Sequence, residues 1–147
     1  MTTQQSEQQL HWEDVQEGQE LPEMRRSPGH TQLFLVSAIT GNPHRIHYDK
    51  DWAIYEGYPD LVIQGPLHGT YISQAIVRWI GPEGSLKRFG YSNRAMAFVG
   101  DELTIKGRVK KKWEEDGRAY VELEAWDENP RGEVCAPATA TVILPKR

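Results

Sequence analysis

Three stretches in the last third of the chain alternate between apolar and polar residues, and this pattern constrains the fold more than any other. They cover residues 104–113, 119–126 and 134–144. A period of two places successive side chains on opposite faces of a β-strand. In the first stretch, Lys106 and Lys112 fall on one face and Val109 on the other. Short polar links join the stretches, so the pattern predicts antiparallel hairpins that form a meander.

A long helix is expected upstream of these strands. Gly65-Pro66 closely follows the apolar run Leu61-Val62-Ile63, and proline suits the first position of a helix because its missing N–H costs nothing there. The helix should extend from Pro66 to about Ile80, where Gly81-Pro82 stops it. A long helix and an antiparallel sheet predict an α+β fold in which the helix covers one sheet face.

A shorter helix is expected earlier, over residues 31–39. Apolar residues there are spaced by three and by one, and Thr31 is a candidate N-cap. A buried strand is the alternative interpretation. The turn residues Thr40-Gly41-Asn42-Pro43 end this element.

Length and composition predict a single domain. The chain has 147 residues, which fits one domain over residues 11–147. Residues 1–10 are rich in Gln, Thr, Ser and Glu and are expected to be a disordered tail. Mean hydropathy is −0.65, so association with a second copy would help to bury the apolar surface.

Charge and cysteine content exclude several classes of protein. Lys plus Arg is 17 and Asp plus Glu is 21, a net charge of −4, which argues against a nucleic-acid binder. The single Cys135 rules out an internal disulfide framework. No apolar run approaches the roughly 20 residues of a membrane span, and the polar N-terminus lacks the layout of a signal peptide. These features favour a cytoplasmic protein without membrane or nucleic-acid partners.

The densest polar cluster, Asn42-Pro-His-Arg-Ile-His-Tyr-Asp49, contains the best candidates for chemistry. A metal site would need three or four converging ligands, and no second ligand cluster joins His44 and His47. Covalent catalysis lacks a G-x-S-x-G elbow. General acid–base catalysis suits the cluster, because a histidine beside an amide or carboxylate can hold and deprotonate a water. His47 with Asn42 fits this role, and His44 is the rival base. We expect neither a metal nor a cofactor.

Gly65 is a candidate oxyanion donor. If Pro66 opens the helix, the Gly65 N–H points out of the helix start, where the dipole favours negative charge. Glycine also permits close approach of a ligand. Such a donor would stabilise negative charge on a thioester or carbonyl oxygen, although a plain helix start accounts for the same residues.

Four blocks together resemble the MaoC-like, or R-specific enoyl-CoA hydratase, family. They are Thr40 to Asp49, Gly57-Tyr58-Pro59, Gln64 to Gly69 and Val99 to Leu103. They occur in the family's order, and the resemblance covers about Trp12 to Leu144. It implies a hot-dog fold, in which an antiparallel sheet wraps a long helix. Proteins with this fold usually form dimers. It also implies an acyl-CoA thioester substrate, an enoyl-CoA that gains water across its 2,3 double bond or a 3-hydroxyacyl-CoA that loses it.

The resemblance implies a role for particular residues. His47 takes the position of the family's catalytic histidine, Asn42 that of its catalytic aspartate, and Gly65 that of its oxyanion donor. Asn42 is a departure, because an amide can orient a water but cannot take its proton, so proton handling falls mainly on His47. Gln64 stands where a histidine is common, and it is expected, with His44, among the substrate-binding residues.

The substrate and the partner are left open by the resemblance. Residues 44–49, 57–59 and 65–67 look most similar to the mesaconyl-CoA hydratase branch, which also tends to carry Asn at the Asp position. Residues 77–82 are similar to small MaoC subunits of steroid side-chain hydratases. We therefore expect a homodimer or higher oligomer, or a hetero-oligomer with another MaoC-like subunit. Arg94 is a candidate for binding the CoA phosphates, with an ordinary surface cation as the alternative.

Two other functions compete with a hydratase. One is a non-catalytic subunit that binds acyl-CoA within a hetero-oligomer. The other is a hot-dog thioesterase, which the lack of an acidic residue at the helix start disfavours.

Overall fold

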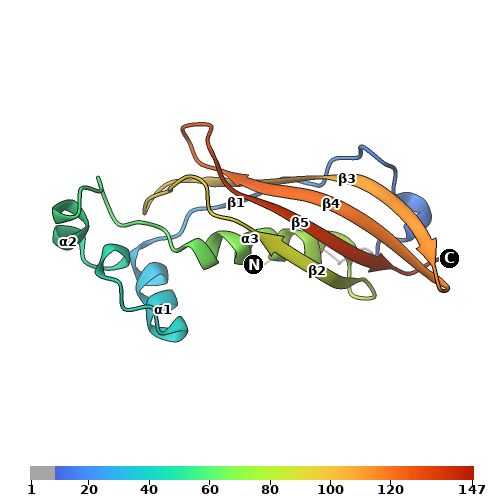
Figure 1. Ribbon diagram of the computed structural model, residues 1–147, viewed down its shortest axis with the longest axis horizontal. Coiled ribbons are helices and arrows are strands. Elements are labelled where there is room, and N and C mark those ends of the chain that lie inside the picture. The colour runs from blue at the N-terminus through green and yellow to red at the C-terminus, as the bar shows by residue number, and fades with distance from the viewer. Residues whose placement is uncertain (1–8) are drawn as a thin grey trace, which may run out of the picture.

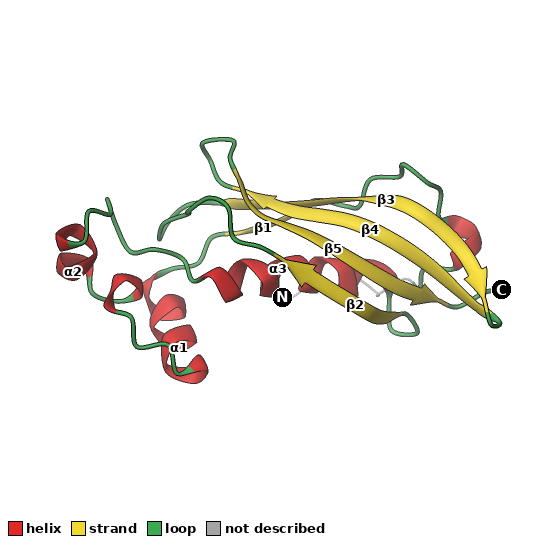
Figure 2. Cartoon of the chain, viewed as in Figure 1, coloured by secondary structure: helices red, strands yellow, loops and turns green. Residues whose placement is uncertain are grey.

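The chain folds as a hot-dog domain, in which a curved antiparallel sheet wraps the long helix α3 (Figures 1 and 2). The computed structural model describes residues 9–147. Its helices are α1 (His30–Thr40), α2 (Lys50–Tyr55) and α3 (Gly65–Ile80), with short 3-10 turns η1 (Trp12–Asp14) and η2 (Arg45–His47). In this part of the chain one sheet has the strand order β1-β3-β4-β5-β2. Its strands are β1 (Met24–Arg26), β2 (Ser85–Tyr91), β3 (Leu103–Glu115), β4 (Arg118–Glu128) and β5 (Val134–Leu144). The α+β prediction is confirmed.

Helix α3 packs on one face of the sheet, as predicted. It starts at Gly65, with Pro66 in its first turn, and ends before Gly81. Its buried side chains include three that repeat every fourth position, Ile72, Ile76 and Ile80. This spacing matches the helical period and gives α3 one apolar stripe. The stripe joins inward-facing side chains of β3, β4 and β5 in a single core.

The predicted meander is confirmed, because β3 pairs with β4, and β4 with β5, in antiparallel register. The prediction that Lys112 shares a face with Lys106 is wrong. A β-bulge between Val109 and Lys111 shifts the register, and an extra residue in one strand reverses the alternation beyond it. The Lys112 ammonium then donates to the carbonyl oxygen of Trp12 at 2.6 Å.

The sequence does not predict β2, one of the two edge strands. β2 contains a bulge between Leu86 and Arg88, and its residues are largely exposed. A strand with a bulge and with most residues exposed lacks the regular apolar–polar alternation by which a half-buried strand is recognised.

The helix prediction for residues 31–39 is confirmed, and the alternative of a buried strand is wrong. The predicted cap is also wrong, because α1 starts at His30 and Gly29 occupies the N-cap position without a side-chain cap. The N-cap therefore lies two residues earlier than the predicted Thr31. Helices α1 and α2 lie together beside the start of α3, beyond the end of the sheet (Figure 1).

Most of the expected N-terminal tail, residues 1–8, lies outside the described residues. The two remaining residues contact the body of the domain. The Gln9 side chain donates to the carbonyl oxygen of Ile80 at 2.9 Å, and Leu10 packs against the core. From residue 9 onward, no helix is long and apolar enough to cross a membrane.

Candidate active site

His47 is held in a defined tautomer by the backbone. It ends η2 and its side chain is buried, with 7% exposed. Its Nδ1 lies 2.7 Å from the carbonyl oxygen of Val62. A carbonyl oxygen only accepts hydrogen bonds, so Nδ1 carries the proton and Nε2 of the neutral ring has an open lone pair. No other hydrogen bond engages Nε2 within residues 9–147. His47 is therefore arranged to accept a proton through Nε2.

The surroundings of His47 also keep its ring neutral. Burial lowers the pKa of His47, and this effect exceeds the rise in pKa caused by the hydrogen bond to Val62. Coulombic repulsion between the two rings, when both are protonated, lowers the pKa of His47 further. The net pKa lies below the ordinary value of 6.5, so the ring is uncharged at neutral pH and can act as a base.

The segment that anchors His47 continues into the start of α3. Val62 N donates to the carbonyl oxygen of Ile46 at 3.0 Å, and Ile63 N donates to that of Ala97 at 2.9 Å. Gln64 is the N-cap and Gly65 the first helical residue. No acceptor among the described residues binds the Gly65 N–H, which is one of the unpaired donors of a helix start. The short segment from Val62 to Gly65 therefore connects the two residues. Val62 holds the His47 ring at one end, and Gly65 starts α3 at the other.

Asn93 covers Gly65 and was not predicted as part of the site. A Cβ atom added to Gly65 would lie 2.4 Å from the Asn93 Nδ2 atom. Glycine is therefore needed here for close packing, and its φ is not positive. Asn93 brings an amide to the start of α3 from a loop that follows β2. The contact joins residues far apart in sequence, so no local pattern announces it.

Asn42 stands at the end of α1, where a left-handed Gly41 with φ 65° turns the chain. Asn42 N donates to the carbonyl oxygen of Ser37 at 2.9 Å, and the Asn42 Oδ1 atom accepts from His44 N at 3.3 Å. Asn42 lines a cavity of about 360 Å³ together with residues that include Phe34, Ser37 and Tyr48. The amide is therefore fixed at the wall of a mostly apolar cavity.

Gln64 is buried rather than open to a ligand, with 1% of the residue exposed. Its Nε2 atom donates to the Leu33 carbonyl oxygen at 2.7 Å and to Ser37 Oγ at 3.0 Å. Its Oε1 atom has no hydrogen-bond partner in the described part of the chain. Gln64 thus ties the start of α3 to α1, and it positions Ser37 at the cavity that Asn42 lines.

Arg94 and His44 are both exposed. His44 Nε2 lies 3.4 Å from the Glu56 carboxylate, and the rings of His44 and His47 stand edge to face with centroids 5.9 Å apart. The Arg94 backbone N–H donates to the carbonyl oxygen of Cys135 at 2.8 Å, which places Arg94 directly after Asn93. His44 therefore belongs to the His47 side of the site, and Arg94 to the Gly65 side.

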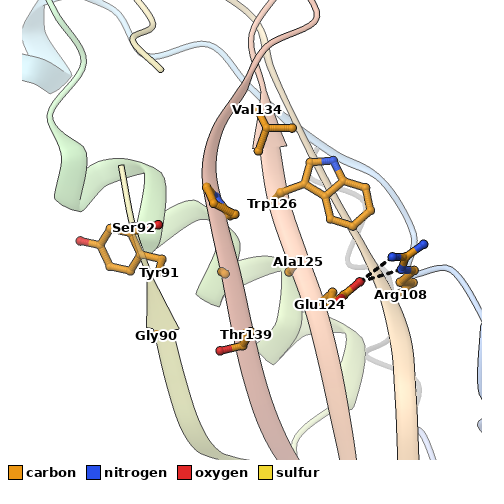
Figure 3. Close-up of a pocket in the computed structure, with 11 residues that line it drawn as sticks. Gly90, Tyr91, Ser92, Arg108, Glu124, Ala125, Trp126, Val134 and Thr139 are labelled. Atoms are coloured by element: carbon orange, nitrogen blue, oxygen red, sulfur yellow. Dashed lines mark hydrogen bonds and ion pairs between the residues drawn. The ribbon is translucent and has the colours of Figure 1, made fainter. Parts of the chain in front are cut away.

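A larger hollow, of about 700 Å³, lies elsewhere on the sheet (Figure 3). Trp126, Val134 and Thr139 line it. Arg108 and Glu124, which also line it, form an ion pair at 2.7 Å between adjacent strands. None of the site residues predicted from the sequence lines this hollow. Its charged groups are already paired with each other, so it offers no evident catalytic group.

The sequence also did not predict a buried polar group behind the start of α3. His68 Nδ1 is hydrogen-bonded to Asp127 Oδ2, and Cys135 lies close enough that the three residues place candidate ligand atoms within 4.8 Å of one another. Two nitrogen or oxygen ligands of one tetrahedral zinc ion would stand roughly 3.3 Å apart. His68 and Asp127 are closer than that, so a hydrogen-bonded pair explains them better than a metal site.

Comparisons with known proteins identify the family of the chain. A family model described as hydroxyacyl-thioester dehydratase type 2 matches residues 1–99, more than half of the chain. A mesaconyl-C(4)-CoA hydratase from Chloroflexus aurantiacus is 61% identical over 36 residues, which are 24% of this chain and 13% of that protein. The beta subunit of a 3-oxo-4,17-pregnadiene-20-carboxyl-CoA hydratase from Mycobacterium tuberculosis is 23% identical over 92 residues, 63% of this chain and 71% of that one.

The fold is shared with solved hydratases. The R-hydratase PhaJ1 from Pseudomonas aeruginosa superposes with a TM-score of 0.85 over 95% of this chain and 88% of its own, at 21% identity. The matched stretches span only 13 to 27% of the length of the first curated relatives. The family model and the fold together settle the family and confirm the resemblance. The chain belongs to the hydroxyacyl-thioester dehydratase type 2 family, one of the MaoC-like hydratases.

Proposed function

We propose that this chain adds water to the 2,3 double bond of an enoyl thioester, or removes it from the 3-hydroxyacyl thioester. The hydrogen bond from His47 Nδ1 to the Val62 carbonyl oxygen is the observation that carries the proposal. It leaves Nε2 as the only nitrogen of the ring that can take a proton, and burial keeps that nitrogen unprotonated at neutral pH.

In the hydration direction, a water binds between His47 and Asn42. His47 Nε2 removes a proton as the water oxygen attacks the β-carbon. The amide of Asn42 orients this water without exchanging a proton with it. Positioned acid–base catalysis of this kind contributes about 100- to 10,000-fold in rate.

Negative charge then moves to the thioester oxygen. The Gly65 N–H at the start of α3 stabilises it, because an unpaired helix-start donor and the helix dipole both favour an anion there. One such donor is worth about 100-fold or more in rate. In this proposal Arg94 binds the CoA phosphates, and its exposure one residue beyond Asn93 supports that role.

The test measures loss of the conjugated enoyl-thioester absorbance with purified protein. The substrates are crotonyl-CoA, a long-chain enoyl-CoA, mesaconyl-CoA and a steroid enoyl-CoA. We expect turnover of at least one, and we expect His47→Ala to abolish it. His30→Ala is the matched control, because His30 is an exposed histidine at the start of α1. Full activity in His47→Ala would refute the proposal.

A non-catalytic subunit is the second candidate, and Asn42 is the observation that favours it. The site has an amide where the family usually carries a carboxylate, and a partner subunit would then supply the complete site. Purification from the native host distinguishes the two. A stoichiometric MaoC-like partner, with no activity from this chain alone, would favour the subunit.

We also propose that the chain works as a homodimer or in a larger assembly. Large apolar side chains of α1 and α2 are exposed, with Ile39 at 82% and Tyr55 at 79%. Burying them on another subunit would gain about 25 cal/mol per Å². Light scattering on the purified protein measures the mass, and a monomer at micromolar concentration would contradict this. We also propose a cytoplasmic location, as the sequence predicts.

A further inference from the structure

We infer that His44, held by Glu56, is a second acid–base residue of the site and donates a proton to the α-carbon of the substrate. This inference rests on the proposed hydratase function. It answers a question which that function leaves open. Asn42 cannot carry a proton, so a reaction that both takes and gives one would otherwise rely on His47 alone.

His44 and Glu56 form an oriented pair rather than a chance contact of two surface groups. Glu56 caps the end of α2, and its carboxylate accepts a hydrogen bond from Trp52 Nε1 at 2.5 Å. The same carboxylate lies 3.4 Å from His44 Nε2. Because Trp52 Nε1 holds this carboxylate in place, the carboxylate can orient the imidazole of His44 through Nε2.

His44 also lies beside the proposed base. The rings of His44 and His47 meet edge to face, with centroids 5.9 Å apart. The His44 side chain is half exposed at 51%, so a substrate and small solutes can reach it. The two histidines differ in their surroundings, because His47 is buried against a carbonyl oxygen and His44 faces a carboxylate. Two neighbouring groups in different surroundings can take separate acid and base roles in one site.

Other proton donors of the same segment are already engaged. The Arg45 guanidinium binds Asp49 at 2.6 Å and stacks on the Trp52 ring at 4.1 Å. The Tyr48 hydroxyl donates to the Pro43 carbonyl oxygen at 2.8 Å. Among the described residues from Pro43 to Asp49, His44 is therefore the titratable group that remains available as an acid.

The proposed steps balance. A C–O bond forms between the water oxygen and the β-carbon while a water proton moves to His47 Nε2, and the π electrons move to the thioester oxygen as an enolate. The enolate then restores its C=O bond, and the α-carbon forms a C–H bond with the proton from His44 Nδ1, the nitrogen that does not face Glu56. Exchange with solvent removes the proton from His47 and returns one to His44. The net change is one water added.

The experiment compares four proteins: the wild type, His44→Ala, Glu56→Gln and Asp51→Asn. Asp51 is an exposed carboxylate on α2 and serves as the matched control for Glu56. We expect His44→Ala to lower kcat by about 100-fold with little change in KM, since general acids contribute at least that much. We expect Glu56→Gln to lower kcat less, and Asp51→Asn to leave it unchanged.

Added imidazole separates chemistry from structure. If His44 donates a proton, free imidazole should restore turnover of His44→Ala in proportion to its concentration, because the vacated position is open to solvent. A merely structural role would not respond to imidazole. Unchanged kcat in His44→Ala, or a loss in a folded variant that imidazole does not relieve, would overturn the inference while leaving the hydratase intact. An inactive wild type would overturn both.

Discussion

The buried pair of His68 and Asp127 permits a quantitative prediction of stability. Asp127 is 0% exposed and sits on β4, and His68 is in the first turn of α3. One carboxylate oxygen, Oδ1, accepts from Ala136 N at 2.9 Å, and the other, Oδ2, from His68 Nδ1. Burial and the charge of Asp127 raise the pKa of the Cys135 thiol to about 12. His68 therefore supplies one of the two hydrogen bonds that stabilise the buried Asp127 carboxylate.

The substitution His68→Leu leaves that carboxylate buried with one backbone partner. Removing one member of a buried pair costs about 3–5 kcal/mol, because the remaining charge is uncompensated. The double variant His68→Leu, Asp127→Asn removes the charge and keeps an acceptor for Ala136 N. Its remaining cost is an unpaired amide N–H, about 1–3 kcal/mol. We therefore expect the double variant to be more stable than the single variant by about 2 kcal/mol.

Urea unfolding followed by tryptophan fluorescence measures both free energies of unfolding, at one protein concentration because association contributes to stability. With a slope of about 2 kcal/mol per M, a loss of about 4 kcal/mol lowers the midpoint by about 2 M. Equal slopes in the variants would show that the free energies are comparable. A loss below about 1 kcal/mol in His68→Leu, or a double variant no more stable than the single one, would refute the reasoning.

Three further predictions concern the site and its surroundings. Because burial holds the pKa of His47 below 6.5, the acid-side loss of kcat/KM should occur only below pH 6.5, as the pH drops through the lowered pKa. An acid-side loss that begins above pH 7 would contradict the assignment. By linkage the lowered pKa of His47 should reduce the free energy of unfolding as the pH falls below 6.5, since His47 then binds a proton in the unfolded chain before it does in the folded one. Acid titration of His47→Gln should show a smaller loss of this free energy than the wild type. Gly65→Ala should fold but lose about 100-fold in kcat, because the new Cβ would displace the exposed Asn93 side chain from the helix start. The melting temperature tests folding and turnover tests kcat. The variant Asn93→Ala shows whether the Asn93 amide itself contributes. Cys135, whose thiol pKa is about 12 and which is fully buried, should resist iodoacetamide at pH 8 in the folded protein and react after unfolding in urea, as mass spectrometry would show.

Those parts of the fold that have a regular local pattern could be predicted from the sequence. Helix α3 was predictable because Gly65-Pro66 and Gly81-Pro82 mark its ends, and the meander because its strands alternate with a period of two. β2 has a bulge and is exposed, so it has no such pattern. Lys112 was placed on the wrong face for the same physical reason, because a single inserted residue in β3 leaves no mark in the sequence.

The candidate site divides in the same way. Asn42, His47 and Gly65 lie in blocks that resemble a known family, so they could be chosen from the sequence. Asn93 could not, because its contact with Gly65 joins the start of α3 to a loop that lies beyond the whole of α3 and β2. The pairing of His68 with Asp127 joins residues 59 positions apart. Contacts of this kind depend on the packing of distant elements, which no local spacing encodes.

The amide at position 42 has a definite electrostatic consequence for the base. A carboxylate beside His47 would stabilise the imidazolium and raise the pKa of the ring. Asn42 carries no charge and adds no such effect, and burial is the largest cause of the lowered pKa of His47. A base of lower pKa takes a proton less strongly but also releases it more readily, and it stays in its reactive form at a lower pH. The amide and the burial therefore act in the same direction. In the proposed mechanism they keep His47 ready to accept a proton, and the return of a proton falls to His44, which lies 3.4 Å from the Glu56 carboxylate.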